Sequence, residues 1–91
     1  MENLAEILEK VDLSGFTELI YGKKLRRYVV AFTHNKERNL LLLENQITFY
    51  HRSFENITIG WRTDHHWDIF IDIGTSTDSL QQARFLQKRY N

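Results

Sequence analysis

The sequence predicts an α+β domain in which an antiparallel β-meander of four to five strands is flanked by an N-terminal and a C-terminal helix. Apolar residues recur at helical spacing at both ends of the chain. Between them, short runs rich in β-branched and aromatic residues alternate with polar turns, as in antiparallel hairpins. With 91 residues and 42% hydrophobic composition, the chain is expected to form a single compact domain, residues 1–91.

The first predicted element is an amphipathic helix over residues 3–12. Its acidic residues lie early, where they suit the positive end of the helix dipole. Ser14 and Gly15 are expected to end it. Its apolar stripe consists of Leu4, Ile7, Leu8 and Val11.

The middle of the chain is expected to supply the strands. Each segment has β-branched or aromatic residues, and polar turns such as residues 34–38 separate them. The expected strands are residues 25–34, 39–43, 47–52, 57–62 and 67–73, of which the second and third can also form one bent strand.

The last two strands are expected to form a hairpin whose loop is residues 64–66. This register places three isoleucine and tryptophan pairs on one face: Trp61 with Ile69, Ile59 with Ile71 and Ile57 with Ile73. On the other face Arg62 meets Asp68, and Gly60 meets Phe70. A shift by one residue would set apolar side chains against aspartates, so the alternation favours this choice of faces. Trp67 is assigned to the core in the same scheme.

The C-terminal helix is expected over residues 79–91. Asp78 is the predicted N-cap, with Gln81 three residues later in the pattern of a capping box. Cations late in the segment suit the negative end of the helix dipole. Its apolar stripe consists of Leu80, Ala83, Leu86 and Tyr90.

Composition limits the classes of function only weakly. The formal net charge is zero, but residues 19–43 carry six lysines and arginines against one glutamate. There is no cysteine, which excludes disulfides and thiolate metal ligands. No signal-peptide pattern or spanning apolar run is present, so we expect a cytoplasmic protein without a membrane partner.

The strongest candidates for a binding site are the aromatic and cationic side chains on the sheet face away from the core. Tyrosine, arginine and phenylalanine are frequent in protein interfaces. We therefore expect a non-enzymatic accessory, adaptor or inhibitor domain that docks onto a larger protein through this face and a basic patch. The alternative is that the C-terminal helix covers this face. The expected partner-binding residues are Arg26, Arg27, Tyr50, Arg52, Arg62 and Phe70, with His65 and His66 as secondary contacts.

Two other functions remain open at this stage. The basic residues 23–27 and the aromatic sheet face would suit nucleic acid, whose binding would weaken steeply with salt. A small metal-assisted hydrolase could use His66, Asp68 and a further histidine, although their spacing matches no known metal motif. We assign no catalytic residue, metal ligand or cofactor, and the oligomeric state is not predicted.

Overall fold

A computed structural model describes residues 3–90 of the chain and confirms the α+β class, with an antiparallel sheet of four strands and helices at both ends. A third helix lies in the middle of the chain. In chain order the elements are α1 (Leu4–Glu9), β1 (Phe16–Tyr21), β2 (Tyr28–Ala31), α2 (Leu40–His51), β3 (Ile57–Thr63), β4 (Ile69–Thr77) and α3 (Leu80–Tyr90).

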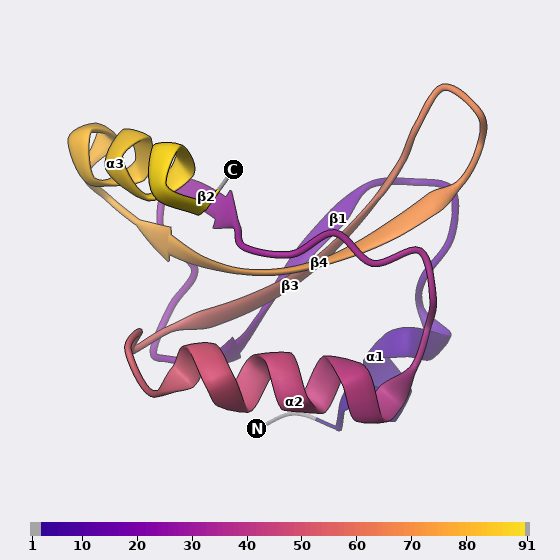
Figure 1. Cartoon of the computed structure of the whole chain (residues 1–91). Helices are drawn as coiled ribbons and strands as arrows, with labels where there is room; N and C mark the ends of the chain where they lie inside the picture. The colour runs from indigo at the N-terminus through magenta and orange to yellow at the C-terminus, as the bar shows by residue number, and fades with distance from the viewer. Residues whose placement is uncertain (1–2, 91) are drawn as a thin grey trace.

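The strands do not pair in chain order, as they would in a simple meander. The sheet order is β1-β3-β4-β2, with every neighbouring pair antiparallel. Among the described residues, only β3 and β4 form a hairpin, which extends beyond the rest of the sheet in Figure 1. The two early strands are the edges, so the later hairpin forms the centre of the sheet.

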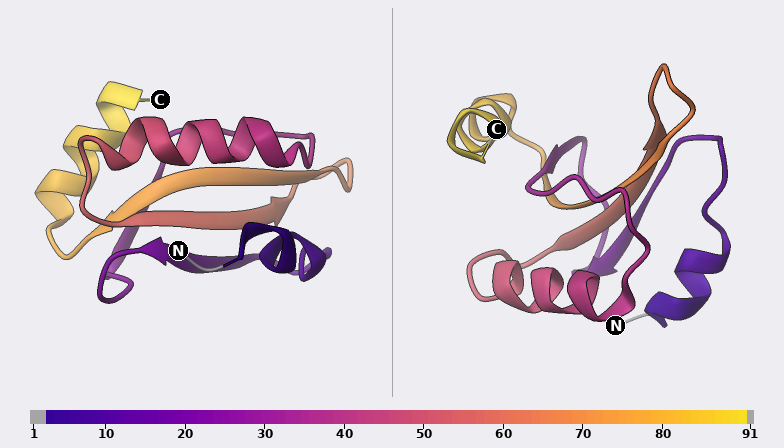
Figure 2. Two further views of the ribbon diagram at one scale, coloured as in Figure 1. Left: turned by 90° about the horizontal axis from the view of Figure 1, so that it is seen from below. Right: turned by 45° about the vertical axis from the view of Figure 1, so that its right-hand side comes forward.

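All three helices pack on the same side of the sheet. α1 and α2 cover the buried isoleucines of β3 and β4, and α2 runs along these strands (Figure 2). α3 lies beside β2 (Figure 1), where Ala83 and Leu86 pack against Val30. The ladder places Val30 opposite Thr75, two residues beyond Ile73 and so on the same side of β4. The alternative that α3 covers the second face is therefore wrong.

The N-terminal helix forms where its periodicity predicted. Asn3 accepts hydrogen bonds from the backbone N–H groups of Ala5 and Glu6, which caps the first turn. Leu4 and Ile7 are buried against the sheet. The regular helix ends at Glu9, earlier than the predicted residue 12.

The expected strands at 39–43 and 47–52 are wrong, because this segment is the helix α2. Asn39 accepts a hydrogen bond from the N–H of Leu42 at 3.0 Å and begins the helix. Leu43 and Ile47 are fully buried one turn apart, whereas Leu41 is 66% exposed. The alternating apolar residues in 47–52 are locally compatible with a strand. As a helix, however, the segment packs Leu43 and Ile47 against the buried isoleucines of the sheet, and this tertiary packing outweighs the local preference.

The strand β1 was not predicted. Its sequence mixes buried Ile20 with half-exposed Thr17 and Glu18, so it lacks clear alternation. Pairing with the distant β3 stabilises it, with a register shift between Leu19 and Tyr21. The predicted strand 25–34 is confirmed only over its central residues, Tyr28–Ala31.

The β3–β4 hairpin has the predicted faces but a register two residues away from the prediction. Trp61 pairs with Ile71 and Ile59 with Ile73. Because side chains alternate with a period of two, this even shift keeps the same residues on each face. The loop lengthens to residues 64–68, and Trp67 is 73% exposed with φ of 66° instead of buried.

The C-terminal helix begins with a different cap from the one predicted. Ser79, not Asp78, accepts the N–H of Gln82 through its Oγ at 3.1 Å. Ala83 and Leu86 of the predicted stripe are buried. Leu80 is 44% exposed. Asn91 lies outside the described residues.

Candidate functional site

The sheet face opposite the helices is hollowed, and no helix within residues 3–90 covers it. Thr58 on this face is only 1% exposed, and its neighbours Gly60 and Gly74 are buried. The flanking strands β1 and β2 must therefore shield the central strands themselves. The sheet curls so that its edges rise on both sides of β3 and β4.

Two glycines allow this curvature. A Cβ on Gly60 would lie 3.1 Å from the carbonyl oxygen of Phe16 and 3.1 Å from Oγ1 of Thr17, both on β1. A Cβ on Gly74 would overlap the carbonyl oxygen of Val30 on β2. Any side chain at Gly74 would push β2 away, so glycine is needed here for close strand approach.

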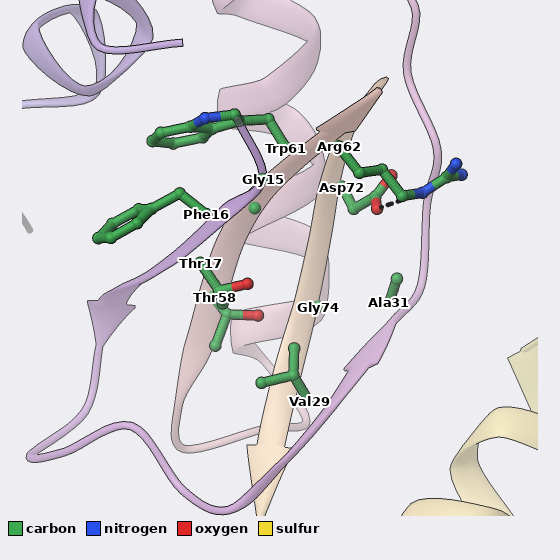
Figure 3. A pocket seen from close by; sticks show the side chains of 11 residues that line it. Gly15, Phe16, Thr17, Val29, Ala31, Thr58, Trp61, Arg62, Asp72 and Gly74 are labelled. Carbon is green, nitrogen blue, oxygen red and sulfur yellow. Dashed lines mark hydrogen bonds and ion pairs between the residues drawn. The ribbon is translucent and has the colours of Figure 1, made fainter. Parts of the chain in front are cut away.

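The hollow is a groove of about 440 Å³, which we call the open-face groove (Figure 3). Its floor is made of small residues on β3 and β4, and its walls come from β1 and β2. Val29 on the β2 wall is 45% exposed, whereas the Phe16 side chain lies beside its ladder partner Trp61 on the helix side of the sheet (Figure 3). The lining residues are Gly15, Phe16, Thr17, Val29, Ala31, Thr58, Gly60, Trp61, Arg62, Asp72 and Gly74.

A polar cluster closes one end of the groove (Figure 3). Asp72 receives the Nε–H of Arg62 at 3.3 Å through one carboxylate oxygen and lies 3.0 Å from Nδ1 of His34 through the other. The Arg62 guanidinium also lies 4.7 Å from the centre of the Phe70 ring. This arrangement orients Arg62 at the groove end while leaving 49% of its side chain exposed.

The predicted pair of Arg62 with Asp68 is wrong, because of the register. Phe70 lies opposite Arg62, and Asp72 lies opposite Gly60. Asp68 instead lies 3.9 Å from Nζ of Lys36. The alternation of β4 placed Asp72 on the open face, but it did not show that Asp72 would bind both Arg62 and His34.

The hairpin tip that contains His65 and His66 is a compact loop organised by Asp64. Asp64 accepts the N–H groups of His66 and Asp68 at 2.9 and 3.0 Å. Desolvation raises the pKa of Asp64, but these N–H groups and the nearby imidazoles outweigh it and hold the pKa below its usual range. Both histidines are exposed, with their ring centroids 3.9 Å apart.

Of the two arginines in the predicted basic segment, Arg26 forms an ion pair with Asp78, whereas Arg27 forms none within residues 3–90. Arg26 donates from Nη1 to Asp78 at 2.8 Å, and its backbone N–H binds Ser76. The Arg26 side chain, and then the backbone N–H of Arg27, lower the pKa of Asp78. The exposed Arg27 side chain takes part in no ion pair among residues 3–90.

Tyr50 and Arg52 do not lie on the sheet face, because their segment is helical. Tyr50 stacks on Phe32 with ring centroids 4.3 Å apart and contacts Tyr90 edge-on at 6.0 Å. Arg52 is exposed at the end of α2. Of the predicted docking residues, only Arg62 and Phe70 are brought together on the open face.

Neither a metal cluster nor a membrane-spanning helix is found in the described part of the chain. Within residues 3–90, His, Asp and Glu side chains form no group of three that could hold a metal ion. No helix over these residues combines the length and apolar character needed to cross a bilayer. Comparison with protein-family models, curated proteins and solved structures finds no match to this chain.

Proposed function

We propose that the chain is a non-enzymatic accessory, adaptor or inhibitor domain that docks onto a larger protein through the open-face groove. The observation that carries this proposal is the one-sided packing of the sheet. All three helices gather on one face, while the other is left hollow and bears small and apolar side chains. Exposed apolar surface of this kind is typical of protein interaction sites.

The groove chemistry favours an apolar segment of the partner that carries a carboxylate at one end. Val29 and Ala31 offer apolar contacts on the β2 wall. At the closed end Arg62 is held in place by Asp72 and Phe70, with half of its side chain exposed. An oriented arginine can donate to a second carboxylate with little loss of side-chain entropy. We expect His65, His66 and the basic residues Arg26 and Arg27 to make secondary contacts.

Paired variants test whether this face binds a partner. The tagged chain is used to capture proteins from its own cells after nuclease treatment, and the captured protein is then purified and titrated. Val29→Lys and Arg62→Glu should abolish its binding, because they place a charge in the groove and reverse the one at its end. The matched controls Phe85→Lys on α3 and Arg52→Glu on α2 should retain it, since both lie off this face.

The result that contradicts the proposal is equally specific. If the partner stays bound to Val29→Lys and Arg62→Glu but is lost with either control, the docking surface lies on the helices. If nuclease releases everything captured, nucleic acid is the ligand. Circular dichroism of each variant checks that the fold is retained.

The two alternative functions have less support from the geometry. Nucleic-acid stacking was expected on an aromatic sheet face, but Tyr50 lies in the cluster with Phe32 and Tyr90. The metal-assisted hydrolase would use His66 and Asp68, whose loop is organised through backbone hydrogen bonds to Asp64. The cytoplasmic location stays a prediction from the sequence.

A further inference from the structure

The two strands at the edges of the sheet differ in how they are protected from pairing with another chain. β2 has four residues, and α3 packs beside it. β1 has six residues and contains neither lysine nor proline, which commonly block an exposed edge. A register shift lies between Leu19 and Tyr21, at the far end of the strand. β1 is therefore the edge that is more open to pairing.

The ladder pattern shows which backbone groups of β1 point outward. Both backbone groups of Ile71 bond on the side of β4 that faces away from β3. Two residues that face each other in an antiparallel ladder either bond to each other or both point away, so Trp61, the partner of Ile71, points toward β1. Phe16 is the partner of Trp61 and points back toward β3. The N–H and C=O groups of Thr17 therefore point outward, and those of Leu19 do the same.

No other part of the described chain uses these outward groups. Within residues 3–90, the backbone N–H and C=O groups of Thr17 and Leu19 take part in no hydrogen bond. Beside this edge, the Phe16 side chain is 53% exposed, although it packs on Trp61 with ring centroids 5.4 Å apart. An added strand would satisfy the backbone groups and cover part of the exposed ring.

The β1 edge is complementary to itself in one antiparallel register. In a symmetric pair, residues of the same face lie opposite each other, so the two-fold axis passes between two copies of one residue. An axis at Thr17 sets Phe16 against Glu18 of the second copy. It also pairs the outward groups of Leu19 with those of Gly15. An axis at Glu18 would set two glutamates opposite each other, which destabilises a ladder, and an axis at Leu19 would include the register shift.

The charges beside the edge favour the axis at Thr17. Glu18 binds Nζ of Lys10 through Oε1 at 3.3 Å, and the Lys10 side chain is 57% exposed. By the alternation of β1, Glu18 lies on the helix side of the sheet, as Phe16 does. Opposite Phe16 of the second copy, the Lys10 ammonium can reach the exposed ring in a cation–π contact. The formal net charge of zero leaves two copies without net repulsion.

We propose that two copies of this chain pair antiparallel through the outer edges of β1, about a two-fold axis at Thr17. The two four-stranded sheets then form one continuous sheet. Because the axis is perpendicular to the sheet, the two open-face grooves lie on the same side of the dimer. A partner with two docking segments would bind both grooves, which raises its overall affinity. The pairing itself does not depend on the proposed docking function.

Sedimentation velocity of the purified chain tests whether it pairs with itself. One strand edge buries less surface than a standard interface, so the dissociation constant of the dimer should be roughly 10–100 µM. Between about 1 and 500 µM, the sedimenting particle should change from the monomer to one of twice the chain mass. A chain that stays monomeric at the highest concentration overturns the proposal.

Charge variants at Phe16 test the register. Phe16→Glu places a second carboxylate opposite Glu18 of the second copy and should weaken the dimer by at least about fivefold. Phe16→Lys places a cation there and should retain the dimer. Phe85→Glu is the matched control on α3, where the ring is 60% exposed, and it should change the dimer affinity by less than about twofold. Equal losses with Phe16→Glu and Phe16→Lys would overturn the axis at Thr17.

Hydrogen exchange of the unmodified chain locates the contact without any variant. The Thr17 and Leu19 amides should exchange at least about threefold more slowly at about 500 µM than at about 5 µM, whereas the Val29 amide on β2 should not change. If the Val29 amide is protected instead, the copies meet at the other edge. If only the purified docking partner slows the Thr17 amide, the β1 edge binds a segment of that partner. Either result overturns the proposal.

Discussion

Substituting alanine for each of three glycines tests whether close strand approach shapes the sheet. At Gly74 the new Cβ would overlap the carbonyl oxygen of Val30 and lie 3.0 Å from Cα of Ala31. Both are backbone atoms, so a rotamer change cannot relieve the overlap and β2 must move away. At Gly60 the nearest atoms are 3.1 Å away, and at Gly15 the nearest atom is 3.5 Å away, an ordinary contact.

The expected changes in the free energy of unfolding differ in sign along this series. Overpacking costs about 1–3 kcal/mol in well-packed sites, and Gly74→Ala should reach the upper end of this range because the main chain must move. For a domain of this length, about 3 kcal/mol corresponds to a fall in Tm of roughly 12–24 °C. Gly15→Ala should instead gain about 0.4–1 kcal/mol from the reduced entropy of the unfolded chain. Gly60→Ala should fall between the two.

Thermal and urea unfolding monitored by circular dichroism measure all three variants. The order of stability should be Gly15→Ala above Gly60→Ala above Gly74→Ala. Hydrogen exchange should also show that Gly74→Ala loosens β2 while β3 stays protected, because β3 pairs on both sides without β2. The reasoning would be refuted if Gly74→Ala melted at the same temperature as Gly15→Ala.

Three more outcomes are expected. In urea unfolding, Leu43→Ala should cost about 2–5 kcal/mol of unfolding free energy, whereas Leu41→Ala should cost less than about 0.5 kcal/mol. Similar losses at both positions would contradict the helix, since a strand places the two side chains on one face. Asp78→Asn should destabilise the fold at neutral pH. Because folding lowers the pKa of this carboxyl below its ordinary value of 3.8, the difference should persist down to about that pH and vanish as the pH falls further, through the pKa of the folded state. A difference that persists in strong acid would exclude the ion pair as its cause. Asp64→Ala should speed exchange of the His66 amide, measured by NMR, whereas unchanged exchange would show that the loop does not depend on this carboxylate.

The predicted partner residues separate because their segments fold differently from the prediction. Arg62 and Phe70 share a face because side chains alternate along β3 and β4, and this alternation is visible in the sequence. Tyr50 and Arg52 were assigned to that face only because residues 47–52 alternate locally, and the helix α2 removes them from it. The edge position of β2 and the packing of α3 beside it were not predicted, since no local pattern indicates which strand is an edge or which helix lies beside it.

The sequence by itself determined the two terminal helices and the two faces of the β3–β4 hairpin. Apolar spacing of three and four residues buries Leu4 and Ile7, and strict alternation buries Ile59 and Ile71, whichever even register the hairpin adopts. Only the tertiary structure decided the helix α2, the sheet order and the hollow of the open face. These features depend on contacts between segments far apart in the chain, such as the approach of β2 to Gly74, and local periodicity carries no information about such contacts.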